Sequence, residues 1–286
     1  MTNMKNSIKI KIGPVVANIT SQNKDMIALI SKNYPGFKST EKAELVVDVK
    51  LISKNTLKPK QIRIFYNQKK DAVSFISGSW GIKASLFLKD KRMLLNLRKV
   101  KSPARQKRMF LIAFRLLFEY HIIAIKKGIL LHASGLIKKH DAYVFSGNCG
   151  SGKSFIAKNL KDKKGFKLMN DECILLTYTD KKTYAYSTIF TGKEALRPNN
   201  LHGKIKALYF LKKSNQNRRV RLSQIQSATN FLYQTILPGI ALKNTTSFQN
   251  NLFRRRYLEL VSRMSSNTRC YELERNFSKK RITIIE

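Results

Sequence analysis

The stretch Gly147-Asn148-Cys149-Gly150-Ser151-Gly152-Lys153-Ser154 decides the fold. It matches the phosphate-binding pattern G-x-x-x-x-G-K-[ST], the P-loop, at every fixed position. Residues 142–146 before it are apolar and rich in strand formers, and residues 155–160 after it carry apolar side chains at helical spacing. The sequence therefore predicts a strand, a glycine-rich loop and the start of a helix in succession, which is the setting that the motif requires.

The residue types of this loop suit it to bind the phosphates of a nucleotide. Gly147, Gly150 and Gly152 permit backbone angles that turn successive N–H groups toward one concavity. The following helix adds its free N–H groups and the positive end of its dipole. Lys153 would reach the β- and γ-phosphates, and the hydroxyl of Ser154 would bind Mg²⁺. The alternative is a glycine-rich turn that matches the pattern by chance.

An acidic pair and a histidine lie near the loop in the sequence. Asp171 follows Lys153 by 18 positions (171 − 153), which leaves room for one helix and one turn, so Asp171 and Glu172 can reach the adjacent strand edge. One carboxylate would bind the metal, directly or through water, and the other would take a proton from an attacking hydroxyl. A solvated turn is the alternative. His132 lies within a predicted strand at 129–137, one hairpin before the loop, and is either packed or part of the site.

The chain divides into two predicted domains. Residues 1–100 predict a β-rich N-terminal domain with one helix at 24–33 and strands at 8–17, 43–52, 61–66, 72–76, 82–88 and 93–97. Residues 101–286 contain the P-loop and begin with a helix at 103–126, between Pro103 and Gly128. Beyond the acidic pair we predict helices at 222–237 and 249–264 and strands at 183–189, 205–211, 271–274 and 281–285. These patterns indicate the α/β class.

The composition favours a globular, cytoplasmic protein. Hydrophobic residues make up 43% of the chain, which is enough for a core. We find no apolar run near the roughly 18 residues that a membrane span needs, and residues 8–12 alternate like a strand and not like a signal-peptide core. The three cysteines, Cys149, Cys173 and Cys270, form no C-x-x-C pair. This spacing argues against a disulfide framework or a cysteine zinc site and favours a reducing compartment.

The chain is strongly basic. It has 56 Lys and Arg residues against 17 Asp and Glu residues, a formal net charge of +39. One interpretation is an anionic partner such as nucleic acid, an acidic protein or a membrane surface. The other is a composition shaped by an AT-rich coding sequence, because the basic residues are spread along the whole chain. On either interpretation we expect salt-sensitive, non-specific adsorption to polyanions.

Three segments together resemble one kinase family. His132-Ala133-Ser134-Gly135, then Ser146 and the P-loop, then Leu168-Met169-Asn170-Asp171-Glu172 resemble the HPr kinase/phosphorylase family and its serine-kinase-like relatives. In those proteins a strand with a histidine precedes the P-loop, a short helix follows, and the next strand ends in two acids. The resemblance is strongest over about residues 128–176 and looser toward Tyr271-Glu272-Leu273.

The resemblance implies a P-loop fold with a phosphoenolpyruvate-carboxykinase-like mixed sheet core, and phosphoryl transfer from ATP to a serine-type hydroxyl of a protein or small molecule. By position, Lys153 takes its P-loop role and Ser154 binds Mg²⁺. Asp171 falls on the catalytic acid/base, and Glu172 on the second, metal-binding acid, where the family usually has Asp. His132 falls on the family's histidine. Related kinases are often homo-oligomers.

Two other functions fit the same residues. The chain could be a nucleotide-binding regulatory module that holds ATP without consuming it. It could also be a nucleic-acid-stimulated ATPase, although such enzymes usually place the acidic motif further from the P-loop. We find no N-K-x-D motif, which disfavours GTP. Lys193, Glu194 and Arg197 lie in a predicted loop and are candidate substrate contacts, and the phosphate acceptor is left open.

Overall fold

The structure is a computed structural model that describes residues 6–53, 62–161, 165–191, 198–235 and 251–276. The chain forms two compact units, each built on its own mixed β-sheet. Unit 1 comprises residues 1–126 and 240–256, and unit 2 comprises residues 127–239 and 257–286. The predicted α/β class is confirmed at the level of two mixed sheets with associated helices.

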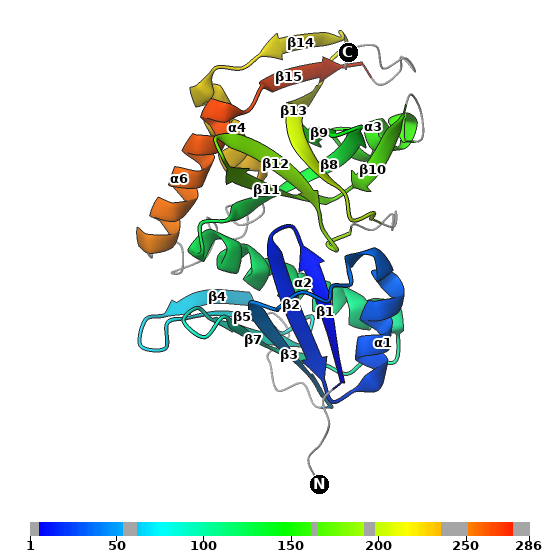
Figure 1. Ribbon diagram of the computed structural model, residues 1–286, viewed down its shortest axis with the longest axis vertical. Coiled ribbons are helices and arrows are strands. Elements are labelled where there is room, and N and C mark those ends of the chain that lie inside the picture. The colour runs from blue at the N-terminus through cyan, green and yellow to red at the C-terminus, as the bar shows by residue number, and fades with distance from the viewer. Residues whose placement is uncertain (1–5, 54–61, 162–164, 192–197, 236–250, 277–286) are drawn as a thin grey trace. The chain divides into compact units, whose positions relative to one another are not determined.

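Unit 1 holds a seven-stranded sheet in the order β1-β2-β3-β7-β6-β5-β4 (Figure 1). β3 runs parallel to both β2 and β7, and the other neighbours are antiparallel. α1 packs on β1 and β2, and α2 packs on β5, β6 and β7. The elements are β1 (Asn6–Ile12), β2 (Val15–Ser21), α1 (Lys24–Asn33), the 3-10 helix η1 (Pro35–Phe37), β3 (Leu45–Ile52), β4 (Ile62–Asn67), β5 (Ala72–Ser77), β6 (Ile82–Phe87), β7 (Arg92–Arg98) and α2 (Pro103–Ala124).

Two features of unit 1 differ from the sequence expectation. Residues 8–17, predicted as one interrupted strand, form the hairpin of β1 and β2, because Gly13 takes a φ of 57° and turns the chain before Pro14. The sequence pattern places residues 103–126 in the second domain, whereas the buried apolar face of α2 packs on the sheet of unit 1, and the units divide between Lys126 and Lys127. The helix itself begins as predicted, with Ser102 as its N-cap.

Unit 2 holds an eight-stranded sheet in which β8 and β13 each pair with three other strands. The pairings β8–β11, β11–β12, β12–β13, β13–β9 and β9–β8 close a ring. β13 is parallel to β9 and β15, and the other pairs are antiparallel. The strands are β8 (Gly128–Lys138), β9 (Asp141–Ser146), β10 (Phe166–Asn170), β11 (Cys173–Thr179), β12 (Lys182–Ser187), β13 (His202–Lys213), β14 (Arg218–Arg221) and β15 (Cys270–Arg275).

The remaining described helices are α3, α4 and α6. α3 (Lys153–Leu160) and α4 (Gln224–Gln234) lie in unit 2 and pack on β8, and α3 also contacts β9. The residues of α6 (Asn251–Asn267) are divided between the two units after Arg256. The predicted helices at 222–237 and 249–264 are therefore confirmed within the described residues, whereas the predicted strand at 281–285 lies outside them.

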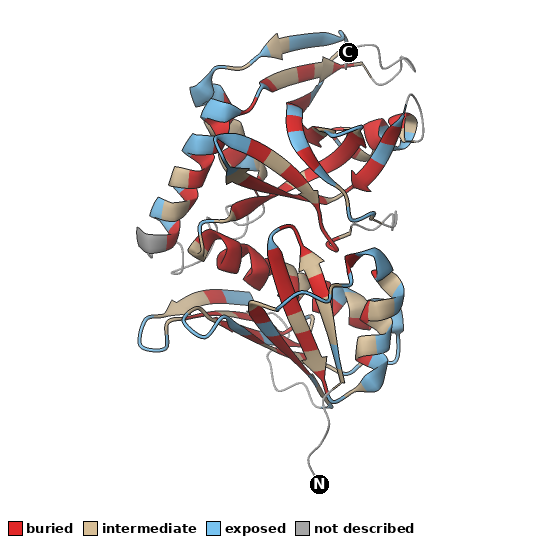
Figure 2. Ribbon diagram, viewed as in Figure 1, coloured by how far each residue is buried: buried red, intermediate tan, exposed pale blue. Residues whose placement is uncertain are grey.

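The core of unit 2 fixes the helix that follows the glycine-rich loop. Ile156, Ala157 and Leu160 of α3 pack against Phe145 of β9 and Leu136 of β8, and all five side chains are buried. The buried strands β8 and β11 run through the middle of this unit (Figure 2). Because α3 presents one apolar stripe to the sheet, its N-terminus is held at the end of β9.

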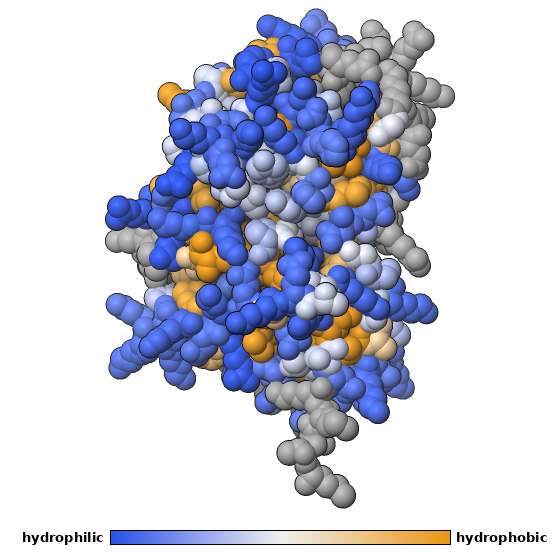
Figure 3. Space-filling model, viewed as in Figure 1, coloured by the Kyte–Doolittle hydropathy of each residue, from blue (hydrophilic) through white to orange (hydrophobic). Residues whose placement is uncertain are grey.

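The surface in view is mostly hydrophilic. Figure 3 shows hydrophilic side chains over most of this face, with hydrophobic ones in small groups between them. Within the part of the chain that the structure describes, none of the helices combines the length and the apolar character needed to cross a bilayer.

Candidate functional site

The glycine-rich loop joins the end of β9 to the start of α3, as predicted. β9 ends at Ser146 and α3 begins at Lys153, with Gly152 as its N-cap in a left-handed conformation (φ 94°). Gly147 (φ 153°) and Gly150 (φ 76°) also take positive φ values. Since only glycine adopts such angles without strain, the three glycines allow the loop to curve around the helix N-terminus.

Gly147 is closely packed against its neighbours. A Cβ atom on Gly147 would lie 2.7 Å from Ser151 Oγ and 3.0 Å from the backbone oxygen of Leu211. The second contact is with backbone, which cannot rotate away. Any side chain at this position would therefore displace the loop from β13.

We expect Gly147→Ala to weaken nucleotide binding about tenfold or more, because the left-handed φ adds roughly 1–2 kcal/mol of strain and the methyl group displaces the loop. Gly165→Ala is the matched control, since Gly165 also has a positive φ (78°) but a Cβ there meets nothing within 4 Å. Titration with a fluorescent ATP analogue measures both variants. Equal affinity of wild type and Gly147→Ala would show that the loop does not hold the phosphates.

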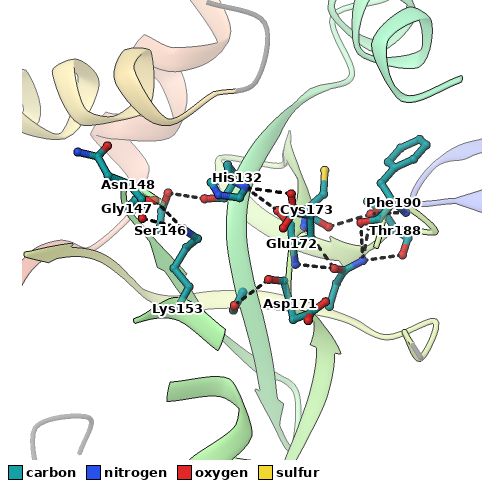
Figure 4. Close-up of polar contacts among 12 residues, drawn as sticks. His132, Ser146, Gly147, Asn148, Lys153, Asp171, Glu172, Cys173, Thr188 and Phe190 are labelled. Carbon is teal, nitrogen blue, oxygen red and sulfur yellow. Dashed lines mark hydrogen bonds and ion pairs between the residues drawn. The ribbon is translucent and has the colours of Figure 1, made fainter. Parts of the chain in front are cut away.

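The ammonium of Lys153 lies inside the curve of the loop (Figure 4). Its Nζ donates to the backbone oxygens of Gly147 (2.7 Å) and Asn148 (3.0 Å), and the residue is buried. Burial lowers the pKa of Lys153 from its usual range, and the nearby Glu172 and Cys149 oppose this shift. The cation is thus placed where an anionic group would gain most from it.

β8 holds the loop and the acidic pair on its two edges. On one edge Ala133 pairs with Ser146, the residue before the loop, and Ser146 Oγ donates to His132 O (2.9 Å). On the other edge the Ala133 N–H donates to Glu172 O (3.2 Å), and His132 pairs with Cys173. Two strand spacings, about 10 Å in all, therefore separate the backbones of the loop and the acidic pair.

Asp171 and Glu172 form the two-residue break between β10 and β11. Ser134 Oγ donates to Asp171 O (3.2 Å), which ties this break to β8. Asp171 is buried, with 4% of its surface exposed, and Glu172 is half-buried. His132 is half-buried too, and its Nδ1 lies 3.1 Å from Glu172 O and 3.7 Å from Glu172 Oε1. The structure therefore brings His132, Lys153 and the two acids of the prediction into one region.

The other predicted site residues either belong to the glycine-rich loop and the first turn of α3 or lie outside the described residues. Ser154 lies in the first turn of α3 and is half-buried, while Asn148, Cys149 and Gly150 are exposed and Ser151 is buried. Lys193, Glu194 and Arg197 lie outside the described residues.

Sequence reasoning did not single out three polar residues of this region, which are Asn170, Thr188 and Gln234. The side chain of Asn170 forms hydrogen bonds with the backbone of Glu172 and Cys173 and with the backbone of Thr188, in the segment after β12. Gln234, at the end of α4, donates from Nε2 to Asn148 Oδ1 (3.1 Å) in the loop. An asparagine directly before an acidic pair is typical of a side chain that caps its own turn, and this signal could have identified Asn170. The contact of Gln234 joins residues 86 positions apart and has no sequence signature.

The residue types fit a nucleotide with one Mg²⁺ ion. The loop offers a buried ammonium, positive-φ glycines and a helix N-terminus, and a carboxylate and a hydroxyl lie nearby in Glu172 and Ser154. Among the described residues no group of three or more His, Cys, Asp and Glu side chains is arranged to hold a metal. Mg²⁺ usually takes part of its ligands from phosphate and water and only one or two from protein side chains.

Comparison with protein-family models gives no match, and comparison with curated proteins gives none. Among solved structures, the HPr(Ser) kinase/phosphatase from Coxiella burnetii is similar with a TM-score of 0.24 and 18% sequence identity. The similarity covers 32% of this chain and 72% of that chain. A TM-score this low assigns neither a fold family nor an activity to the chain.

Proposed function

We propose that the protein is an ATP-dependent kinase that transfers the γ-phosphoryl group to a serine-type hydroxyl of a protein or small molecule. One observation carries the proposal: a single strand, β8, holds the phosphate-binding loop on one edge and Asp171 with Glu172 on the other. Phosphoryl transfer needs a cation cluster for the phosphates and a carboxylate for the attacking hydroxyl within one site.

The chemistry divides among the residues of this region. Lys153 and the loop N–H groups would bind the β- and γ-phosphates and stabilise the charge that spreads over the γ-phosphoryl oxygens. Ser154 and Glu172 would hold Mg²⁺, which would supply positive charge to offset the negative charge of the phosphates. The hydroxyl oxygen of the acceptor would attack the γ-phosphorus, and Asp171 would accept the proton that this hydroxyl loses. The bond between the γ-phosphorus and the oxygen that bridges it to the β-phosphate would break, which releases ADP.

His132 would orient Glu172 in this scheme. Its Nδ1 approaches both the backbone oxygen and the carboxylate of Glu172, so the ring limits the positions that this carboxylate takes. We also propose two finer properties that the family resemblance over residues 128–176 implies: a phosphoenolpyruvate-carboxykinase-like core for unit 2 and assembly into homo-oligomers. A cytoplasmic location is proposed on separate grounds, because the cysteine spacing favours a reducing compartment.

A second candidate is an ATP-binding module without kinase activity. The burial of Asp171 favours it, because a carboxylate with 4% exposure needs local opening before a hydroxyl reaches it. Incubation with Mg·ATP, followed by chromatography of ATP, ADP and phosphate, distinguishes the candidates. A kinase consumes ATP when its acceptor is present, and a binding module returns ATP intact. Consumption that requires added DNA or RNA would contradict both and identify a nucleic-acid-stimulated ATPase.

A further inference from the structure

The carboxamide of Asn170 joins the acidic break to a second segment of unit 2. Its Oδ1 accepts from the N–H groups of Glu172 (2.8 Å) and Cys173 (3.2 Å). Its Nδ2 donates to Thr188 O (2.8 Å), Thr188 Oγ1 (3.3 Å) and Phe190 O (3.3 Å). We call this set of contacts the Asn170 clamp; Figure 4 labels its partners Glu172, Cys173, Thr188 and Phe190.

Thr188 completes the clamp from the other side. Its Oγ1 donates to Cys173 O (2.8 Å) and accepts from the Phe190 N–H (3.2 Å). Asn170, Thr188 and Phe190 are each at most 1% exposed. Because these residues are buried, water cannot replace a lost hydrogen-bond partner. The network therefore stabilises one arrangement of this backbone over others that would leave polar groups unpaired.

The clamp leaves the backbone around Glu172 little freedom. The Glu172 N–H donates to Asn170 Oδ1, and the backbone oxygen of Glu172 lies against the Ala133 N–H and His132 Nδ1. The backbone oxygen of Asp171 accepts from Ser134 Oγ. β8 therefore fixes the acidic break from one side, and Asn170 fixes it from within its own strand.

We propose that Asn170 is a positioning residue for phosphoryl transfer, which sets where Asp171 and Glu172 stand relative to the phosphate-binding loop. The proposal rests on the proposed kinase function. A catalytic carboxylate that shifts by about 1 Å loses on the order of a hundredfold in rate, so a buried amide that fixes the backbone of both acids controls turnover without touching a substrate.

Asn170→Asp separates the two halves of the clamp. The aspartate still offers an oxygen to the Glu172 and Cys173 N–H groups, but its second oxygen faces three oxygen atoms where the amide donated. We expect kcat to fall about 10- to 100-fold and the Mg²⁺ concentration for half-maximal rate to rise, with the affinity for ATP within about twofold of wild type. Asn199→Asp is the control, because exposed Asn199 also donates to a backbone oxygen near this break, at Leu168 (3.2 Å), and we expect no change in its kcat.

Thr188→Val tests the clamp without a new charge, and Thr188→Ser restores the hydroxyl. We expect a lower kcat in the valine variant and recovery in the serine variant. The valine variant should also melt at a lower temperature, because it leaves buried polar groups without a partner, so kcat is measured well below that temperature. Amide hydrogen exchange at Glu172 and Cys173 should accelerate in Thr188→Val as well. Unchanged kcat in both Asn170→Asp and Thr188→Val, with an active wild type, would overturn the positioning role alone. An inactive wild type would contradict the kinase function itself, and the positioning role with it.

Discussion

Replacement of Lys153 by methionine is expected to lower ATP turnover about 10²- to 10³-fold and to weaken ATP binding. The ammonium is buried inside the loop, where its hydrogen bonds to Gly147 O and Asn148 O place it among the groups that would face the phosphates. A charged donor in a site with little water contributes several kcal/mol to a transition state that carries negative charge, about 3–4 kcal/mol for one such donor. Methionine keeps the length and apolar volume of the side chain and removes the charge.

Steady-state ATP consumption and calorimetric titration with ADP measure the two effects. Lys204→Ala is the control, since Lys204 is an exposed lysine of β13 in the same unit and its removal changes the net charge equally. A Lys153→Met variant that binds ADP as tightly as wild type would mean that the loop does not bind phosphate in the way we propose.

Asp171→Asn is expected to lower kcat about 10²- to 10⁴-fold while the affinity for ATP stays near the wild-type value. The amide has the shape of the carboxylate but cannot take the proton of the attacking hydroxyl. Lys153 and the glycines of the loop are unchanged in this variant, so we expect the nucleotide still to bind. Glu172→Gln should act differently, because a weaker metal ligand raises the Mg²⁺ concentration needed for turnover more than it lowers the rate at saturating Mg²⁺.

Single-turnover kinetics at saturating ATP measure the rate of the chemical step, which should fall in Asp171→Asn. Asp180→Asn is the matched control: Asp180 is exposed and takes a φ of 49°, which asparagine tolerates. If Asp171→Asn transferred phosphate at the wild-type rate, the base would have to be another group, and the assignment of Asp171 would be wrong.

The local elements were predictable because they depend on residues close together in the chain. The loop from Gly147 to Ser154 has strand formers before it and a helical apolar stripe after it, and the structure has a strand and a helix there. The hairpin of β8 and β9 likewise follows from a short polar turn at Lys139-His140 between two apolar runs. Each of these elements depends on the residues of one continuous segment, so the pattern of apolar and polar residues in that segment is enough to predict it.

What the sequence did not reveal depends on contacts between distant segments. β14 was missed because its sequence, Arg218-Arg219-Val220-Arg221, is charged like a loop and forms a strand by pairing with β15. The placement of α2 depended on which of two sheets accepts its apolar face. The role proposed for Asn170 depends on Thr188, which lies 18 positions after Asn170 in the chain and contacts it in the fold.

The measurement that tests the central claim most directly is transfer of the γ-phosphate of labelled Mg·ATP to a hydroxyl acceptor. Wild type, Lys153→Met and Asp171→Asn would be incubated with free serine and, separately, with a lysate fractionated into proteins and small molecules. We predict a labelled, acid-stable phosphate ester with wild type and less than about one per cent of that label with either variant. ATP that binds to wild type in a manner that needs Lys153, with no label on any acceptor and no ATP consumed, would contradict the kinase account and leave a nucleotide-binding module.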